Sequence, residues 1–485
     1  MVWRVRGIRG QRVIADLKPY PAYKDSGIPW MGPVPKHWSV NRIKTVLAEL
    51  DCRSIDGDGT LMSLTRVRGL IPHSDRTAKV HSAKTLVGYK RYQPGQIVMN
   101  RMQAWSGMFG AGSQPGLVSP DYAVFKILGG YDTRLVLERL KTADLVGQFA
   151  NESKGIGSGF NRLYTDRFGP IPISLPPLSE QAAIVKFLDW ANARLERTIR
   201  AKRRVIALLT EQKQAIIHRA VTRGLDPNVP LKPSGIAWLG GMPAHWEMRR
   251  LRTLVHRIDQ GVSPLAVGFL AEGNSWGVLK SGCVNRGTFR ETEHKQLARD
   301  FEIDPSIVVK VGDVLISRAC GSPTLVGSVG RVRSLNYRLI LSDKIFRAVF
   351  KVLIDEDFMV LVMNSRYYRQ HVEQAISGAE GMANNLPLSS LRGFSFAIPP
   401  LDEATAISAF VNAETKALDT AISRLSREID LLLEYRTRLV ADVVTGKLDV
   451  REAAARLPLN EVELALEPEA LALDDGSDEE VALED

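Results

Sequence analysis

The sequence predicts an α+β protein in which two mixed α/β domains alternate with two long helices. A thirteen-residue motif occurs twice, as SGIPWMGPVPKHW at 26–38 and as SGIAWLGGMPAHW at 234–246. Two later stretches, 179–221 and 402–444, contain no Gly or Pro. A period of more than 200 residues is too long for a solenoid repeat. The chain therefore holds two copies of a domain-plus-helix unit, and we expect approximate two-fold symmetry within it.

The segments between these landmarks consist of short apolar runs broken by Gly, Pro and Asn. Runs at 96–99, 122–127 and 308–316 are typical of short strands joined by turns, and helices should be interleaved with them. We predict these boundaries: a leader at 1–19, a first domain at 20–178, a long helix at 179–224, a second domain at 225–401, a second long helix at 402–447 and an acidic tail at 448–485. The leader and the tail are expected to be disordered.

The two stretches without Gly or Pro carry helix start and stop signals. Ser179 and Asp402 are followed at once by Glu, which favours a helix N-terminus, and Gly224 and Gly446 lie near the ends. Each helix would be about 65 Å long at 1.5 Å per residue, so we expect the two to pack against each other. In the second helix, one row of side chains steps by four and three residues, as in a coiled coil: Leu418, Ile422, Leu425, Ile429, Leu432, Arg436, Leu439 and Val443.

The offset between the two copies increases along the chain. It is 208 at the Ser-Gly-Ile motif, 217 at the strand-end arginines, and 223 at the Pro-Pro-Leu sequences and beyond the helices. The globular segments have therefore accepted insertions, while the helices have kept their length. We infer that two helices of equal length set a distance and that two diverged domains set two specificities.

Composition favours a cytoplasmic protein that binds a polyanion. The net charge is +10, but the last 25 residues hold eleven carboxylates and no Lys or Arg, so the rest of the chain carries +21. A body this basic is attracted to nucleic acid. No apolar run reaches membrane-spanning length, and no signal peptide is recognisable. Three widely spaced cysteines favour a reducing compartment and neither a disulfide framework nor a zinc site.

The sequence contains no convincing catalytic motif. It has no phosphate-binding loop of the Gly-x-x-x-x-Gly-Lys-Ser/Thr type and no Asn/Asp-Pro-Pro-Tyr/Phe segment of an amino-methyltransferase. The eight histidines show no metal-ligand spacing. His37 and His245, each beside a repeated tryptophan, are interpreted as structural residues.

Several polar segments are candidates for DNA contact. Arginine, lysine and asparagine on loops are the side chains that most often reach base edges and phosphates. For each residue alone, a solvated surface charge or a turn former is the simpler interpretation, but the recurrence of the segments in both halves favours a common role. The candidates are Arg66, Arg68, Arg101, Asn161 and Arg162 in the first half and Lys280, Asn285, Arg286, Arg318, Asn384 and Asn385 in the second.

Two motifs give the chain a family resemblance. Residues 23–32 with 35–38 closely resemble a motif of the DNA-specificity (S) subunits of type I restriction-modification systems. Residues 176–184 resemble the start of that family's helical region, although Ala404 replaces the glutamine expected in the second copy. The resemblance extends over about 23–450. It implies two target-recognition domains separated by an antiparallel coiled coil of two conserved helices.

Membership of that family would imply a non-catalytic subunit. Each recognition domain would read one half of a bipartite, asymmetric site in double-stranded DNA. The helices would fix the spacer between the half-sites and dock two methylation subunits. S-adenosylmethionine, ATP and magnesium would be bound by the methylation and motor/endonuclease subunits, and this chain would hold no cofactor.

Two other classes of function remain open from the sequence. The chain could be a coiled-coil scaffold that joins protein-binding modules in a defence complex without reading DNA. A self-contained methyltransferase is disfavoured, because no methyl-donor motif is present. DNA binding separates the first alternative from the leading hypothesis, and donor binding by the isolated chain would revive the second.

Overall fold

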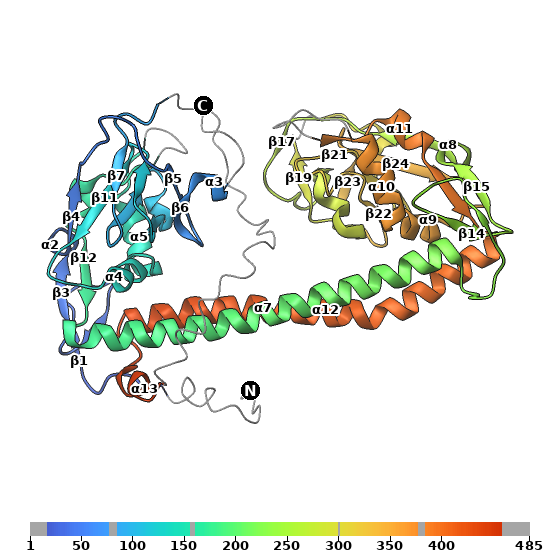
Figure 1. The fold of residues 1–485 in the computed structure, drawn as a ribbon. Coiled ribbons are helices and arrows are strands. Elements are labelled where there is room, and N and C mark those ends of the chain that lie inside the picture. The colour runs from blue at the N-terminus through green and yellow to red at the C-terminus, as the bar shows by residue number, and fades with distance from the viewer. Residues whose placement is uncertain (1–16, 77–84, 156–160, 299–300, 377–383, 458–485) are drawn as a thin grey trace. The chain divides into compact units, whose positions relative to one another are not determined.

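The structure, a computed structural model of the chain, divides into two compact units (Figure 1). Unit 1 combines residues 1–201 with 428–485, and unit 2 consists of residues 202–427. Each unit contains one globular domain and part of each long helix, which confirms the predicted α+β class. The structure describes residues 17–76, 85–155, 161–298, 301–376 and 384–457, without the side chain of Arg286.

A four-stranded antiparallel sheet forms the centre of the first domain, in the order β4-β11-β8-β9. Its strands are β4 (Leu47–Leu50), β11 (Tyr122–Ile127), β8 (Ile97–Asn100) and β9 (Phe109–Gly110). The apolar runs at 96–99 and 122–127, which predicted strands, correspond to β8 and β11. Phe125 on this sheet packs against Phe168, which in turn contacts Phe149. These side chains are almost fully buried and belong to the core of the domain.

Paired strands and short helices surround this sheet. The strand pairs are β1 (Tyr23–Asp25) with β2 (Pro33–Pro35), β3 (Ser39–Arg42) with β12 (Pro172–Leu175), β5 (Met62–Thr65) with β6 (Gly69–Pro72), and β7 (Lys90–Tyr92) with β10 (Gly116–Val118). The helices are α2 (Ile43–Val46), α3 (His73–Arg76), η1 (Ala104–Ser106), α4 (Thr133–Leu140), α5 (Ala143–Glu152) and α6 (Thr165–Phe168).

The second domain repeats the central sheet in the same order, β16-β24-β20-β22. Its antiparallel strands are β16 (Val255–Gln260), β24 (Ile345–Phe350), β20 (Val314–Ser317) and β22 (Val329–Arg331). The apolar run at 308–316 contributes β20. Because each strand occupies the same place in its sheet, β4 corresponds to β16, β11 to β24, and β8 to β20. The duplication seen in the sequence is therefore a duplication of topology.

The domains differ in the strands beside the central sheet. In the second domain, these strands join into one sheet in the order β17 (Ala266–Val267), β19 (His294–Leu297), β18 (Trp276–Leu279) and β23 (Arg338–Ile340). The remaining strand pairs are β13 (Leu231–Pro233) with β14 (Gly241–Pro243), β15 (Glu247–Arg250) with β26 (Ser395–Ile398), and β21 (Ala319–Cys320) with β25 (Asn384–Asn385). The helices are α8 (Leu251–Leu254), η2 (Ser281–Gly287), η3 (Pro305–Ile307), α9 (Glu356–Val362), α10 (Arg366–Ala375) and α11 (Leu388–Gly393).

The two long helices are α7 (Leu178–Arg223) and α12 (Leu401–Val444), and they pair in opposite directions (Figure 1). In unit 1, the first turns of α7 share a buried cluster with the last turns of α12. In unit 2, the last turns of α7 share a cluster with the first turns of α12. Polar contacts follow the same pairing: Arg436 lies 3.3 Å from Glu196 in unit 1, and Lys213 lies 2.6 Å from Asp419 in unit 2.

The predicted apolar row of α12 is the face that is shielded from solvent. Each of its members, from Leu418 to Val443, is buried or half-buried. The polar interruption at Arg436 is explained by its ion pair with Glu196 of α7. A charged residue in the row is tolerated because its partner lies on the facing helix.

The repeated motif ends in a His-Trp pair that holds the first turn of a long helix. In unit 1, His37 Nε2 lies 2.6 Å from Glu180 Oε2, and Trp38 Nε1 donates to Glu180 Oε1 at 3.3 Å. The second copy repeats this arrangement on Glu403, with His245 at 2.7 Å and a tryptophan donor at 3.1 Å. The glutamates that signalled helix starts in the sequence are thus the acceptors of both His-Trp pairs. Both histidines are structural in this sense, as interpreted.

The glycines that end the two helices close against the same motif. Gly446 has φ +78°, and a Cβ there would lie 2.6 Å from the ring of Pro35. Gly224 has φ +70°, and a Cβ there would lie 3.0 Å from Glu403. A side chain at either position would be strained by the backbone and crowded by its neighbours.

The expectation of a disordered tail from residue 448 is wrong for its first ten residues. The backbone amide of Asp449 donates to the carbonyl oxygen of Lys18 at 2.8 Å, and α13 (Arg451–Ala455) follows. Val450 and Leu457 are buried in the cluster at the start of α7. The expectation of disorder rested on the eleven carboxylates from Glu461 onward, whereas the stretch before them carries apolar side chains that pack. The rest of the tail, and the leader before residue 17, lie outside the described residues.

Candidate nucleic-acid interface

In both domains, the arginine at the end of a central strand is hydrogen-bonded to the segment that precedes a helix. The carbonyl oxygen of Arg101, just after β8, accepts from the amide of Leu163 at 3.0 Å. The carbonyl oxygen of Arg318, just after β20, accepts from the amide of Leu386 at 2.9 Å. The structure thus brings together, within each domain, two of the segments singled out in the sequence.

Asn161 and Arg162 form the described end of the glycine-rich segment in the first domain. Asn161 is exposed. Arg162 exchanges two backbone hydrogen bonds with Lys154, at 2.9 and 2.8 Å, and its guanidinium lies 3.3 Å from the carboxylate of Asp121. Because both partners of this ion pair are exposed, its net stabilisation is small and another anion could replace the carboxylate. Residues 158–160 lie outside the described residues.

In the second domain, Asn384 and Asn385 form the short strand β25. Asn384 lies opposite Cys320 of β21, and its side-chain amide donates to the carbonyl oxygen of Gly321 at 3.2 Å. Both asparagines are half-buried. The other predicted members of this segment, residues 381–383, lie outside the described residues.

Arg66 and Arg68 lie at the tip of the hairpin formed by β5 and β6. The guanidinium of Arg66 donates to the carbonyl and hydroxyl oxygens of Ser106, at 3.0 and 3.1 Å. Ser106 belongs to η1, only a few residues beyond Arg101 along the chain. Arg68 donates to the carbonyl oxygen of Asp75 at 3.3 Å, and both arginines are exposed. The hairpin tip is therefore tied to the connection that follows β8.

The counterpart segment in the second domain is the connection between β18 and β19. Lys280 precedes η2, and its backbone amide donates to the carbonyl oxygen of Glu293 at 2.9 Å. Asn285 lies within η2, and its side-chain oxygen is buried without a hydrogen-bond partner among the described residues. The side chain of Arg286 lies outside the described part of the chain. η2 packs beside β20, β21 and β22, so this segment lies close to the strand that pairs with β25.

Sequence reasoning missed Glu49, whose carboxylate joins three elements of the first domain. Its Oε1 accepts from Arg101 at 2.5 Å and from Lys90 at 3.2 Å, and its Oε2 accepts from the hydroxyl of Thr165 at 2.6 Å. Thr165 is the first residue of α6, three positions after Arg162. A single acidic residue on a short strand gives no sequence signal, because its partners are 41, 52 and 116 positions away.

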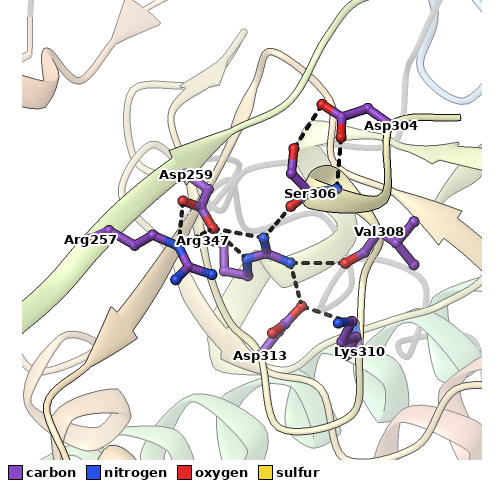
Figure 2. A network of polar contacts seen from close by, with 8 residues as sticks. All are labelled: Arg257, Asp259, Asp304, Ser306, Val308, Lys310, Asp313 and Arg347. Atoms are coloured by element: carbon purple, nitrogen blue, oxygen red, sulfur yellow. Dashed lines mark hydrogen bonds and ion pairs between the residues drawn. The ribbon is translucent and has the colours of Figure 1, made fainter.

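The second domain contains a different buried network, centred on Arg347 of β24 (Figure 2). The guanidinium of Arg347 lies 2.7 Å from Asp259 and 3.2 Å from Asp313, and it donates to the carbonyl oxygens of Ser306 and Val308 at 2.5 and 2.9 Å. Burial by itself would lower the pKa of Arg347, but its bond to Asp259 and the charge of Asp313 raise that pKa above its ordinary value. The network ties β16, β24 and the 306–313 segment together.

Among the described residues, no carboxylate pairs with Arg318 as Glu49 pairs with Arg101. Its guanidinium donates to the backbone carbonyl oxygen of Asp343 at 3.0 Å and lies 5.9 Å from the ring centre of Phe346. A carbonyl and an aromatic ring hold a guanidinium in place without neutralising it. Arg318 is therefore suited to contact a phosphate or the acceptor edge of a guanine.

The arrangement offers donor groups that suit DNA. Among the described residues, no group of three or more His, Cys, Asp or Glu side chains could hold a metal ion. The helices in the described part of the chain also include none that is long and apolar enough to cross a membrane. The candidate residues around Arg101 and Arg318 carry guanidinium and amide groups, which donate hydrogen bonds to phosphates and to base edges.

Comparisons with known proteins agree with the sequence and the fold. A family model described as the type I restriction modification DNA specificity domain matches residues 140–202. The chain is 26% identical over 305 residues to the MjaVIII specificity subunit of Methanocaldococcus jannaschii, a match covering 62% of this chain and 67% of that protein. It is 29% identical over 188 residues to the EcoEI specificity subunit of Escherichia coli, a match covering 38% of this chain and 31% of that protein.

The fold is also known from a solved structure. A chain from a type I restriction-modification system superimposes with a TM-score of 0.51 at 16% identity, covering 86% of this chain and 99% of that one. The fold class of this chain is therefore one in which two mixed α/β domains alternate with two paired long helices. Residues 140–202 thus match the DNA specificity domain of type I restriction-modification systems, and the chain is similar in sequence to specificity (S) subunits of such systems.

Proposed function

We propose that the chain is the DNA-reading subunit of a type I restriction-modification complex. Each domain contacts one half of a bipartite, asymmetric site in double-stranded DNA. The paired helices α7 and α12 fix the spacer and dock two methylation subunits. The chain itself is non-catalytic and cytoplasmic. S-adenosylmethionine, ATP and magnesium are used by the methylation and motor/endonuclease subunits.

The observation that carries this proposal is one backbone arrangement that presents two different sets of side chains. Both domains join a strand-end arginine to a polar segment by a backbone hydrogen bond. The first domain adds Asn161 and Arg162 to Arg101, whereas the second adds Asn384 and Asn385 to Arg318. Different donors on one frame are expected to select different base pairs. This is the requirement for reading an asymmetric site.

The charge of the chain supports nucleic acid as the partner. Without the acidic segment from Glu461 onward, the chain carries +21, enough to attract a duplex at a distance. Phosphate contacts would then supply most of the affinity, and base contacts would supply the choice of sequence.

A DNA titration tests the proposal against the scaffold alternative. We expect the full chain to bind a random duplex with an affinity that falls steeply between 50 and about 200 mM salt, because each neutralised phosphate releases counterions. A scaffold that does not read DNA would bind weakly and show little dependence on salt. Donor binding by the isolated chain would point to a methyltransferase instead.

The target is obtained by mapping methylated adenines in the host genome, which gives both half-sites and the spacer at once. The spacer then tests the role of the helices. A seven-residue insertion in α12 alone is expected to weaken assembly or to change the spacer, because α7 and α12 would no longer match in length. An intact complex that methylates the same spacer would contradict the proposed function of the helices.

A further inference from the structure

The carboxylate of Glu49 contacts both the strand-end Arg101 and Thr165, which lies three positions after Arg162. Its Oε1 binds Arg101, just after β8, and its Oε2 binds Thr165, the first residue of α6. The side chains of Glu49 and Arg101 are each 23% exposed. The contact therefore lies at the edge of the core, where the domain meets solvent.

Both oxygens of this carboxylate are already occupied by donors from the protein. Oε1 accepts from Arg101 and also from Lys90, and Oε2 accepts from Thr165. A carboxylate reads a base by accepting from the amino group of cytosine. With its acceptors taken by three side chains, Glu49 is placed to hold other residues and not to read a base itself.

Lys90 explains why the carboxylate is held firmly. Its side chain is only 2% exposed, and a buried ammonium requires a nearby anion. Glu49 lies 3.2 Å from the Lys90 ammonium and Asp51 lies 3.6 Å from it. Bonds between charged partners are stronger than neutral ones, so Lys90 anchors Glu49 on the core side. The opposite side of the same carboxylate then fixes Arg101 and Thr165.

We propose that Glu49 is the positioning residue of the first recognition domain, and this inference rests on the proposed function. It locks the strand-end arginine and the Asn161–Arg162 segment into one arrangement before DNA binds. A pre-ordered contact surface loses less entropy on binding and presents its donors in one geometry. Sequence discrimination at the half-site read by this domain therefore depends on Glu49, although Glu49 does not contact DNA.

The described part of the second domain contains no equivalent contact. In the register of the central sheets, Glu49 lies opposite Phe125, and the equivalent pair in the second domain is Ile258 opposite Ala348, so an apolar residue takes the place of Glu49. The proposal therefore predicts an effect that is confined to one half-site. A general loss of stability or of charge would not be confined in this way.

Asp51 provides a matched control within the same network. It shares Lys90 with Glu49 and pairs with Arg53, but no contact of its carboxylate with Arg101 or Thr165 is found among the described residues. Glu49→Gln and Asp51→Asn each remove one carboxylate from Lys90 while keeping nearly the same shape. Only Glu49→Gln also weakens the side-chain contacts with Arg101 and Thr165.

The test uses the full chain and duplexes that carry the mapped target, single base-pair changes in either half-site, or an unrelated sequence. Dissociation constants are measured at one salt concentration for the native chain, Glu49→Gln and Asp51→Asn. Glu49→Gln is expected to lose about tenfold discrimination at one half-site only, an effect comparable to that of one good base contact. Its affinity for the unrelated duplex should stay the same or rise, because a negative charge has been removed. Asp51→Asn should stay within about twofold of the native chain at both half-sites, since neither reading segment is touched.

Three results would overturn the inference: unchanged discrimination by folded Glu49→Gln, equal loss at both half-sites, or the same loss in Asp51→Asn. If the native chain itself fails to distinguish the target from the unrelated duplex, the proposed function fails, and this is seen before any variant is compared. Should Glu49→Gln not fold, Thr165→Val removes only the hydroxyl that binds Glu49, and Thr165→Ser restores it. Discrimination at the same half-site should fall in Thr165→Val and should be retained in Thr165→Ser. No change in folded Thr165→Val would also overturn the inference.

Discussion

The two domains share a sheet order but stabilise it with different buried cations. In the first domain, Lys90 on β7 is neutralised by Glu49 and Asp51, and Glu49 extends the network to Arg101. In the second domain, Arg347 on β24 is neutralised by Asp259 and Asp313. The first network thus reaches the candidate DNA segments, whereas the second secures the 306–313 segment inside the domain.

This difference shows that two copies of one fold can use different buried ion pairs to hold different segments in place. In the register of the central sheets, Asp259 lies opposite Arg347, whereas the equivalent pair in the first domain is Leu50 opposite Val124, so both the acceptor and the cation differ between the two domains. A buried charge needs a partner, but the partner can come from any strand that passes close enough. Each domain can therefore change its surface segments while its sheet is preserved.

The largest expected effect is on the stability of unit 2. Arg347→Met removes the cation between Asp259 and Asp313 and leaves two carboxylates close together. We expect a loss of about 3–5 kcal/mol in the free energy of unfolding, as for other broken buried ion pairs. Chemical denaturation, followed for the transition of unit 2, measures it. Arg257→Ala is the control, because Arg257 binds the same Asp259 from an exposed position, where a pair contributes less than about 1 kcal/mol. Equal losses in the two variants would contradict the central role of Arg347.

The next effect is on sequence discrimination by the two domains. Replacing Asn161 and Arg162 by Ala should relax one half-site, and replacing Asn384 and Asn385 by Ala should relax the other. Removing one good bidentate pair of hydrogen bonds to a base costs about 1–3 kcal/mol of discrimination. Binding to targets altered in one half-site at a time measures this. If either double substitution weakened both half-sites equally, its residues would be general phosphate binders.

A smaller effect is expected for the buried cation of the first domain. Lys90→Met fills nearly the same volume, and Glu49 keeps its bonds to Arg101 and Thr165. We therefore expect only about 1 kcal/mol of lost stability in unit 1, because Glu49 keeps a cationic partner in Arg101 and Asp51 is 59% exposed and pairs with Arg53, so neither carboxylate is left buried and unpaired. Denaturant unfolding compared with Arg347→Met tests this contrast. A loss as large as that of Arg347→Met would mean that the two networks are equivalent.

The smallest effect is expected at the His-Trp pairs, where the two units are most alike. The side chains of His37 and His245 are 40% and 46% exposed, and without them Glu180 and Glu403 each keep the hydrogen bond from a tryptophan. His37→Ala and His245→Ala should each cost less than about 1 kcal/mol and by similar amounts. Thermal unfolding of the two variants side by side measures the costs. A much larger loss in one of them would show that the repeated motif serves the two units differently.

Much of the fold was predictable because its signals are local. Helix starts at Ser179 and Asp402 and helix ends at Gly224 and Gly446 follow from short-range capping and from the absence of Gly and Pro. The strands β8 and β11 follow from apolar runs. The ordered segment after residue 448 was not predicted, because a short apolar stretch beside an acidic tail gives no periodic signal. Its order comes from packing against the start of α7.

The candidate interface was predictable only in part. Repetition singled out Arg101 with the Asn161 segment, and Arg318 with the Asn384 segment, and the structure joins each pair through a backbone hydrogen bond. By itself, the sequence determined the duplicated frame, since repeats, caps and apolar periodicity are properties of neighbouring residues. Only the tertiary structure decided that Glu49 meets Lys90, Arg101 and Thr165, or that Arg347 meets its two aspartates. These contacts depend on strand order and register, which bring together residues that lie far apart in the sequence.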